Sequence, residues 1–309
     1  MPSGGRRPFL NYARMNVAFL GLGAIGLPMA RHVAARFPLS VWNRTGAKAE
    51  TFAQQSHARA AATPRDAARD ADVIITCLPT SREVEQLLDG DDGLVAGMQS
   101  AAVLVDCTSG DPSTSQRIAA RLAAGGRSFM DAPVSGGVSG AEQGTLTIMC
   151  GGSETDLTRV RPVLEAFGKK IVLCGAVGAG HAVKAVNQAL LGVHLYAAAE
   201  GLAALVKAGV SPALALDVIN ASSGRCNATE NLIPQRVLTR AFPRTFRLAL
   251  LEKDMGIAAA FARSEGVPAP VLQLTTELYR AARQELGEEA DHVEIAKVVE
   301  RASGTEIRG

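Results

Sequence analysis

The sequence has few aromatic residues and no long run of basic residues. Aromatic residues make up only 4% of the 309 residues, which argues against a single-strand nucleic-acid platform, because such platforms stack bases on aromatic rings. The formal net charge is +2, and the lysines and arginines are scattered along the chain. Without a basic stripe, neither a nucleic acid nor an anionic membrane surface is an expected partner, so we expect a small molecule instead.

The metal-binding residue types lack the spacing of a metal or redox site. No two cysteines form a CxxC pair, and the five thiols are Cys77, Cys107, Cys150, Cys174 and Cys226. The five histidines are equally dispersed, at His32, His57, His181, His194 and His292. The acidic residues form no cluster, so we expect no metal. Reduced structural thiols indicate a cytoplasmic protein.

An uninterrupted apolar run of membrane-spanning length is also missing. The longest candidate covers residues 181–206, but polar residues interrupt it at Lys184, Asn187, Gln188, His194 and Glu200. No run of 18 apolar residues remains, which predicts a buried helix instead of a membrane span. A helix that is apolar almost all round must be covered on every side, and a second copy of the chain would supply part of that cover. We therefore expect a homodimer or homotetramer.

The composition is that of a globular protein with room for two domains. Apolar residues make up 47% and charged residues 20% of the chain, which is typical of globular proteins. Residues 1–14 are expected to form a flexible tail, and Met15 is an alternative start to Met1. Residues 6–10 resemble a twin-arginine signal, but the apolar segment that such a signal requires does not follow them.

Short apolar runs alternate with alanine-rich stretches in the first half. Strands are expected at residues 16–20, 39–42, 73–78, 103–107, 128–131, 146–150 and 171–174. Strands that alternate with helices predict βαβ units and a parallel sheet. After residue 178 only helical segments follow. We expect an α/β, Rossmann-type, doubly wound parallel sheet over residues 15–177 and an all-α substrate and dimerisation domain over residues 178–309.

A glycine-rich turn directly follows the first expected strand. It consists of Gly21, Leu22, Gly23, Ala24, Ile25 and Gly26, and a helical segment follows. In such a turn the first glycine bends the chain, the second lets the backbone approach a pyrophosphate, and the helix N-terminus offers free N–H groups. A GxGxxG pattern alone is weak, but its position between strand and helix predicts a dinucleotide site.

The end of the second expected strand bears on the choice between NAD and NADP. An acidic residue there would bind the ribose hydroxyls and repel a 2′-phosphate. This sequence has Asn43, Arg44 and Thr45 instead. An arginine can bind a phosphate, so NADP is favoured and NAD stays open; a solvent-facing arginine is the alternative interpretation.

Five segments of the chain form a recognisable set: GLGAIGLPMA from Gly21, CLPTS from Cys77, DAPVSGG from Asp131, GTLTIMCGG from Gly144 and GAGHAVKAVNQ from Gly178. Together they resemble the β-hydroxyacid dehydrogenases, which include 3-hydroxyisobutyrate dehydrogenase and tartronate semialdehyde reductase. Their order and spacing match the family from about residue 16 to residue 301. The resemblance implies an NAD(P)-dependent enzyme that transfers hydride between a nicotinamide and a small 3-hydroxy acid or its semialdehyde. Candidate substrates include 3-hydroxyisobutyrate, glycerate with tartronate semialdehyde, and related C3 or C4 semialdehydes.

The resemblance implies that Lys184 is the general acid/base, with Asn187 on the same helix face as an orienting or substrate-binding residue. The sequence supports this independently. Lys184 is the only lysine or arginine between His181 and Val206. An ammonium on a buried helix is costly without a function or a partner, and burial would lower its pKa toward neutrality. A lysine that reaches solvent near the start of the helix is the alternative.

The resemblance also implies further contacts. For the cofactor they are Leu78, Pro79, Ser109 and Lys253. For the substrate they are Ser135, Gly136, Gly137, Asn231 and Asp254, in addition to the lysine and asparagine named above. Thr108 and Ser109 stand in the reverse of the family's usual order, so Ser109 is our choice for the contact near the nicotinamide. The alternative interpretation of Lys253 and Asp254 is a surface ion pair.

Three other functions are alternatives to the dehydrogenase. An imine reductase-like enzyme has the same fold but usually lacks the lysine. A non-catalytic NADP-binding interaction protein would have lost it as well. A 6-phosphogluconate-type dehydrogenase would need additional basic residues and a longer chain. Because Lys184 and Asn187 are both present, the sequence favours the dehydrogenase.

Overall fold

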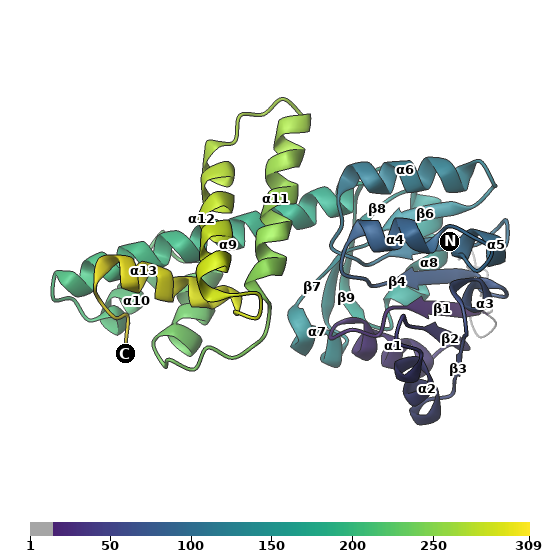
Figure 1. Ribbon diagram of the computed structural model, residues 1–309, viewed down its shortest axis with the longest axis horizontal. Coiled ribbons are helices and arrows are strands. Elements are labelled where there is room, and N and C mark those ends of the chain that lie inside the picture. The colour runs from purple at the N-terminus through teal and green to yellow at the C-terminus, as the bar shows by residue number, and fades with distance from the viewer. Residues whose placement is uncertain (1–14) are drawn as a thin grey trace, which may run out of the picture. The chain divides into compact units, whose positions relative to one another are not determined.

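The computed structural model describes residues 15–309, so the expected flexible tail of residues 1–14 lies outside the described part (Figure 1). The chain divides into two compact units, one ending at His181 and the other running from Ala182 to Gly309. The division falls within the first turns of helix α9 (Ala179–Lys207), whereas the sequence placed the boundary after residue 177.

The first unit contains a nine-stranded sheet in the order β3-β2-β1-β4-β5-β6-β8-β7, with β9 paired to β8. Its parallel strands are β1 (Val17–Leu20), β2 (Leu39–Trp42), β3 (Ala58–Ala60), β4 (Val73–Thr76), β5 (Val103–Asp106) and β6 (Ser128–Asp131). The remaining strands are β7 (Val134–Ser135), β8 (Leu146–Gly151) and β9 (Gly168–Gly175). The order of the first six is that of a doubly wound dinucleotide-binding fold.

The predicted doubly wound parallel sheet is confirmed for β1 to β6, and one edge adds antiparallel pairs that the sequence did not predict. Strand β8 runs antiparallel to both β6 and β7, and β9 then runs parallel to β8. The connection from β7 to β8 contains only the short helix α7 (Gly137–Gln143), and antiparallel neighbours accept short connections. Between β8 and β9 the longer helix α8 (Glu154–Leu164) supplies the crossover that a parallel pair requires.

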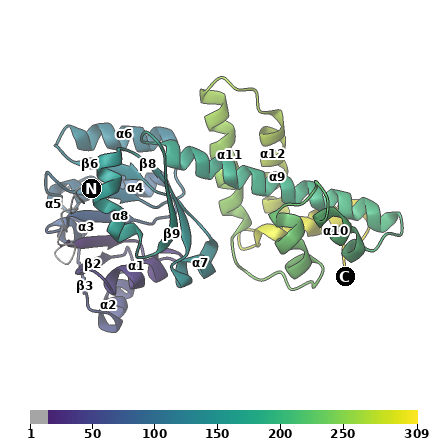
Figure 2. The ribbon, with the colours of Figure 1, turned by 180° about the vertical axis from the view of Figure 1, so that it is seen from behind.

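Both faces of the sheet are covered, as Figure 2 shows from behind. Val17 and Phe19 belong to one hydrophobic cluster, whereas Ala18 and Leu20 belong to another on the opposite face. This alternation follows from the two-residue period of a strand. The other helices of the unit are α1 (Gly26–Ala34), α2 (Gly46–Gln55), α3 (Pro64–Ala68), α4 (Ser81–Leu87), α5 (Leu94–Gly97) and α6 (Pro112–Ala123).

Local sequence sets where several of these helices begin. Helix α6 starts with Asp111 at its N-cap, whose carboxylate accepts a hydrogen bond from the Thr114 N–H at 2.8 Å, and with Pro112 in the first turn. Thr63 caps α3 in the same way and is also followed by a proline. An N-cap oxygen satisfies a backbone donor that the helix leaves unpaired, and proline tolerates the first helical position.

The second unit is helical, as predicted. Besides α9 it contains α10 (Pro212–Asn220), the π-helix η2 (Ala228–Val237), α11 (Leu248–Ser264), α12 (Pro270–Leu286), the 3-10 turn η3 (His292–Glu294) and α13 (Ile295–Ser303). The unit has its own hydrophobic cluster around Leu195, Leu251 and Tyr279. The fully buried Tyr279 donates its hydroxyl to the Gly192 carbonyl of α9 at 3.2 Å, which satisfies the polar end of the ring.

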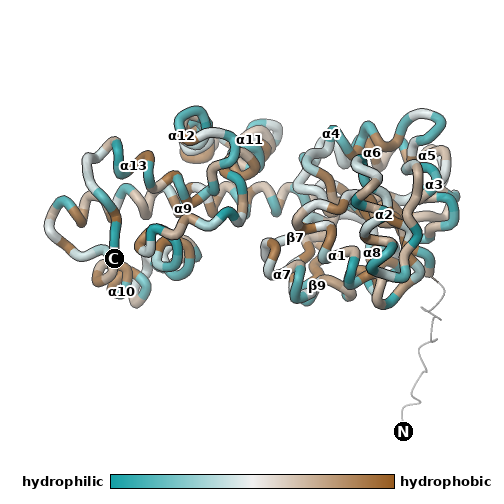
Figure 3. The backbone as a smooth tube through the Cα atoms, turned by 60° about the horizontal axis from the view of Figure 1, so that its bottom comes forward, coloured by the Kyte–Doolittle hydropathy of each residue, from teal (hydrophilic) through white to brown (hydrophobic). Residues whose placement is uncertain are grey.

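Helix α9 is less covered than the sequence predicted. Val183, Val186 and Leu190 are 45%, 38% and 47% exposed, and their spacing places them on one stripe of the helix. By length and composition alone, α9 could cross a membrane, and a third of its most apolar window is buried. Figure 3 shows the mainly apolar and neutral residues along it. The expectation of a helix buried on every side is therefore not met by one chain.

Candidate active site

The glycine-rich turn between β1 and α1 has the geometry that a dinucleotide requires. Gly21 has a φ of +108°, and a Cβ there would collide with the Cys77 carbonyl oxygen. A Cβ on Gly26 would collide with the Gly21 carbonyl, whereas one on Gly23 would meet no atom within 4 Å. Gly21 therefore allows the chain to turn, and Gly26 allows α1 to pack closely against the end of β1. Gly23 leaves open space beside the backbone of the turn. These three roles fit the approach of a pyrophosphate.

The three predicted cofactor residues after β2 differ in their surroundings: Asn43 makes hydrogen bonds within the protein, whereas Arg44 and Thr45 are exposed. The Asn43 side chain accepts a hydrogen bond from the Leu22 N–H at 3.0 Å and donates to the Thr45 carbonyl at 3.1 Å. Asn43 thus ties the end of β2 to the glycine-rich turn. Arg44 and Thr45 are exposed, so an arginine and a hydroxyl face solvent where an NAD-specific site would have a carboxylate.

The loops after β4 and β5 are joined by a buried chain of hydrogen bonds. The Thr108 hydroxyl accepts from the Leu78 N–H at 3.1 Å, and the Thr108 N–H donates to Asp106 at 3.0 Å. Thr76 also donates to this carboxylate, at 2.8 Å. Thr108 is buried within this chain, whereas Ser109 is partly exposed and Pro79 is exposed. The predicted preference for Ser109 over Thr108 as a cofactor contact is consistent with this difference.

The Ser135–Gly137 segment is more regular than the expected loop. Ser135 ends β7, and Gly137 begins α7. Gly136 and Gly137 have φ values of +134° and +64°, a region that side chains with a Cβ rarely adopt. Both glycines are exposed and Ser135 is half-buried, so backbone N–H groups and one hydroxyl are accessible together.

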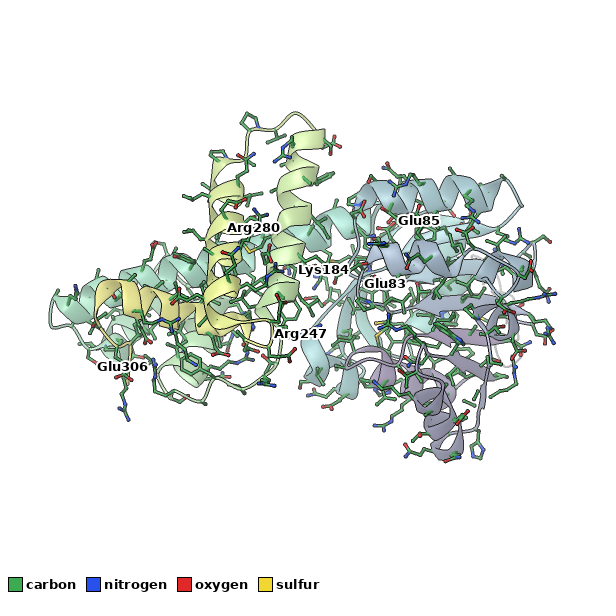
Figure 4. All side chains as sticks on the ribbon, viewed as in Figure 1. Glu83, Glu85, Lys184, Arg247, Arg280 and Glu306 are labelled. Carbon is green, nitrogen blue, oxygen red and sulfur yellow. The ribbon has the colours of Figure 1, made fainter. Side chains whose placement is uncertain are left out.

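Lys184 of helix α9, labelled in Figure 4, belongs to a cluster of polar residues in the helical unit that also includes Lys253, Asp254 and Gln188. It is only 8% exposed on α9. Asp254 of α11 is buried, and its carboxylate pairs with the Lys253 amine at 3.1 Å. Gln188, one turn beyond Lys184, donates to the other oxygen of Asp254 at 3.2 Å. The alternative interpretation of Lys253 and Asp254 was an ion pair at the surface. The pair exists, but this interpretation is wrong for Asp254, because that residue is buried.

The surroundings of Lys184 change the pKa of its amine. Burial lowers the pKa of its amine below the ordinary value, Asp254 opposes that shift, and Lys253 adds to it. Burial disfavours the charged ammonium, and a second positive charge does the same. The neutral amine therefore becomes available at a lower pH than for an ordinary lysine, as the sequence predicted.

The two predicted asparagines differ in their surroundings. Asn187 is exposed on α9 and donates to the Gln188 side chain at 3.2 Å, which connects it to the cluster around Asp254. Asn231 is exposed on η2 and donates to the Asn227 side chain at 3.0 Å. Asn187 thus joins the lysine cluster through a neighbour, and Asn231 belongs to a separate surface pair.

Sequence reasoning missed three buried polar residues. Gln188 stands four residues after Lys184, a spacing that places both on one helix face and could have identified it. Asp131, at the end of β6, accepts from the Gly178 and His181 N–H groups at 2.7 and 2.8 Å. It thereby caps the start of α9, and burial raises the pKa of its carboxyl group against the opposing effects of His181 and these N–H groups. His181 itself is fully buried.

Comparison with known proteins gives a consistent result. Residues 16–175 match the family model for the NAD-binding domain of 6-phosphogluconate dehydrogenase. Residues 178–299 match the model described as the NAD-binding domain of NADP-dependent 3-hydroxyisobutyrate dehydrogenase. The two models together cover nearly all of the described chain.

Individual relatives agree with the family models. The 2-(hydroxymethyl)glutarate dehydrogenase of Eubacterium barkeri is 35% identical, over 96% of this chain and 98% of its own. The 3-hydroxyisobutyrate dehydrogenase of Mycobacterium tuberculosis, solved with L-serine, is 31% identical, covers 93% of this chain and 99% of its own, and has a TM-score of 0.85. Psf3, solved with NADP+ and 2-OPP, is 26% identical over 92% of this chain and 99% of its own, with a TM-score of 0.78.

Proposed function

Since the chain belongs to the β-hydroxyacid dehydrogenase family, we propose that it transfers hydride between a nicotinamide cofactor and the hydroxyl-bearing carbon of a small 3-hydroxy acid. The dinucleotide site is the Gly21–Gly26 turn, where the open space at Gly23 leaves room for a pyrophosphate. When bound, the nicotinamide accepts hydride in oxidation and supplies it in reduction. The nature of the acid, 3-hydroxyisobutyrate or a related C3 or C4 compound, is part of the proposal.

Lys184 acts as the general acid/base in this proposal. In oxidation its neutral amine takes the proton of the substrate hydroxyl, and in reduction its ammonium returns that proton to the forming alkoxide. The observation that carries this role is the burial of the Lys184 amine, which lowers its pKa. A general base is most effective when its pKa is close to the working pH.

The other residues bind and orient. Asn187 lies three residues after Lys184 and contacts the substrate oxygen or holds the lysine. Ser135, Gly136 and Gly137 receive the substrate carboxylate, which their accessible N–H groups and hydroxyl support. Three further contacts are proposed on the resemblance to the family: Lys253 to the cofactor, and Asn231 and Asp254 to the substrate.

We propose NADP as the preferred cofactor. Arg44 and Thr45 are exposed beside the glycine-rich turn and bind the 2′-phosphate, while Asn43 holds the loop. Leu78, Pro79 and Ser109 contact the nicotinamide half. The matching family model is named for an NADP-dependent enzyme, and Psf3 was solved with NADP+, both of which support this choice.

A cytoplasmic homodimer or homotetramer is the proposed state of the protein. The exposed stripe of Val183, Val186 and Leu190 on α9 supports an assembly in which a second copy covers this helix. All five cysteines are free, and burial raises the pKa of Cys77 to about 12. Such thiols resist oxidation, which fits structural thiols in a reducing compartment.

Activity assays on a small panel test the proposal. The purified protein is given 3-hydroxyisobutyrate, glycerate and related 3-hydroxy acids with NADP or NAD, and the matching semialdehydes with the reduced cofactors. We expect absorbance at 340 nm to change with at least one pair and faster with the 2′-phosphorylated cofactor. If no member of the panel reacts with either cofactor, the proposed function fails.

A further inference from the structure

His181 is a buried ionisable residue to which the proposed mechanism gives no role. Its side chain is 0% exposed and lies within the first unit. The Nε2 atom is 2.8 Å from the Thr108 carbonyl oxygen, and the Nδ1 atom is 2.7 Å from the Ser115 hydroxyl. The ring therefore joins the loop after β5 to helix α6.

The direction of one hydrogen bond follows from the chemistry of its partner. A carbonyl oxygen can only accept, so Nε2 of His181 carries the hydrogen and donates it to Thr108. The Ser115 hydroxyl lies within hydrogen-bond distance of both Nδ1 and the Asp111 carbonyl, at 2.7 and 3.1 Å. The Nε2 contact is thus the one that fixes the loop backbone, because it binds a main-chain atom of that loop.

The imidazole contacts both neighbours of Ser109. On one side it holds the Thr108 carbonyl. On the other side Gly110 packs against the ring so closely that a Cβ there would lie 2.8 Å from Cε1 of His181. Thr108 also accepts from the Leu78 N–H, so the same ring braces the loops after both β4 and β5. In doubly wound folds, ligands bind outside the carboxyl ends of such strands.

We propose that His181 is a positioning residue, which holds the Thr108–Gly110 turn in the shape that receives the nicotinamide half of the cofactor. This inference rests on the proposed function. It predicts a selective defect when the Nε2 contact is lost, because the adenosine half of the cofactor binds at the glycine-rich turn and at the end of β2, whereas the ring of His181 binds Thr108 and Ser115.

Two substitutions of His181 test its ring hydrogen bonds to Thr108 and Ser115 one at a time. The amide nitrogen of His181→Gln stands near the position of Nε2 and can still donate to Thr108, whereas that of His181→Asn stands near Nδ1 and cannot. Dissociation constants are measured by fluorescence titration for NADPH and by calorimetry for 2′,5′-ADP, the adenosine fragment. We expect His181→Asn to weaken NADPH binding on the order of tenfold with 2′,5′-ADP unchanged, and His181→Gln to restore NADPH binding to within about threefold of the wild type.

A matched control separates positioning from general destabilisation. His292 is a buried histidine of the helical unit that contacts the Phe246 carbonyl. His292→Gln should lower the thermal midpoint without changing the ratio of the two dissociation constants. If wild-type protein binds neither NADPH nor NADH, both the proposed function and this inference fail. If it binds NADPH and the ratio is equal in the Asn and Gln variants, only the positioning role is overturned.

Discussion

Lys184 shows how a single side chain links burial to chemistry. The residue is only 8% exposed, and the carboxylate that acts on its charge, Asp254, already pairs with Lys253. Asp254 therefore compensates the Lys184 charge only in part, and the pKa of Lys184 falls despite it. A lysine placed for stability alone would have a carboxylate of its own or would reach water.

Replacing Lys184 by methionine should remove turnover and spare cofactor binding. Methionine fills a similar volume but carries no proton, so we expect kcat to fall by about 10²- to 10⁴-fold, the usual contribution of general acid/base catalysis. Stopped-flow or steady-state assays give kcat, and fluorescence titration gives the NADPH dissociation constant. Lys207→Met, at the far end of the same helix, is the control and should behave as the wild type. Similar turnover in both variants would exclude Lys184 from the mechanism.

The same substitution should stabilise the protein in a pH-dependent way. The folded-state pKa of Lys184 is lower than its unfolded value of about 10.4. Folding therefore releases a proton between the two values, and the cost of the buried charge is full below the folded pKa and vanishes above the unfolded one. We expect Lys184→Met to melt higher than the wild type, by a margin that shrinks as pH rises toward 10. Thermal scans at several pH values measure this, and a margin that grows with pH would contradict it.

Individual residues were predictable where their role is local. Gly21, Gly23 and Gly26 could be assigned from the motif because each role depends on the backbone of one turn. His181 and Asp131 could not, because their partners are far along the chain. The His181 contacts reach back 66 and 73 residues to Ser115 and Thr108. Such pairs follow from strand order, which a single sequence does not specify.

At the scale of the element, two glycines of the glycine-rich turn have different roles. Gly23 serves cofactor binding, and Gly26 serves folding. Gly23→Ala adds a methyl group that meets no protein atom within 4 Å, whereas Gly26→Ala drives one into the Gly21 carbonyl. We expect Gly23→Ala to fold normally but to bind NADPH at least tenfold more weakly, because the methyl group occupies the pyrophosphate's path. Gly26→Ala should lose about 1–3 kcal/mol of unfolding free energy. Urea unfolding gives the free energy of unfolding of both variants, and titration gives their NADPH dissociation constants. If Gly23→Ala binds NADPH as tightly as the wild type, the turn is not the pyrophosphate site.

Arg44, in the segment after β2, should determine the preference for NADP over NAD. If Arg44 binds the 2′-phosphate, Arg44→Ala loses a charge-assisted contact worth about 1.5–3 kcal/mol. The KM for NADP should then rise by roughly ten- to a hundredfold, with the KM for NAD nearly unchanged. Arg31→Ala, at an exposed position of α1, is the control and should alter neither. An equal change in both KM values for Arg44→Ala would count against a phosphate contact.

The elements and the parallel pairing of β1 to β6 were largely predictable, but the direction of β8 was not. The expected strands at residues 39–42 and 128–131 match β2 and β6, because apolar runs identify buried strands. The short strands β3 and β7 have no such run and were missed. An apolar run does not indicate which way a strand points, so the antiparallel pairing of β8 became visible only in the structure.

At the scale of the whole molecule, the central strands of the first unit bury their apolar side chains more completely than helix α9 of the second unit does. In the first unit, strands β1, β4 and β5 are buried at every position. In the second, α9 leaves Val186 and Leu190 exposed. A stripe of this kind costs solvation free energy in water, at roughly 25 cal/mol per Å² of apolar surface. Association through this stripe would remove that cost.

A charge on this stripe should therefore separate the copies without affecting the fold of one chain. Leu190 is 47% exposed, so Leu190→Glu disturbs no core packing within the chain, but in an assembly it would bury an unpaired carboxylate. We expect wild-type protein to elute as a dimer or tetramer in size-exclusion chromatography with light scattering, and the variant as a smaller species with an unchanged circular dichroism spectrum. Val267→Glu, at a 54% exposed position after α11, is the matched control and should keep the wild-type mass. A monomeric wild type would refute the assembly, and a Leu190→Glu variant of unchanged mass would place the contact between copies elsewhere than on this stripe.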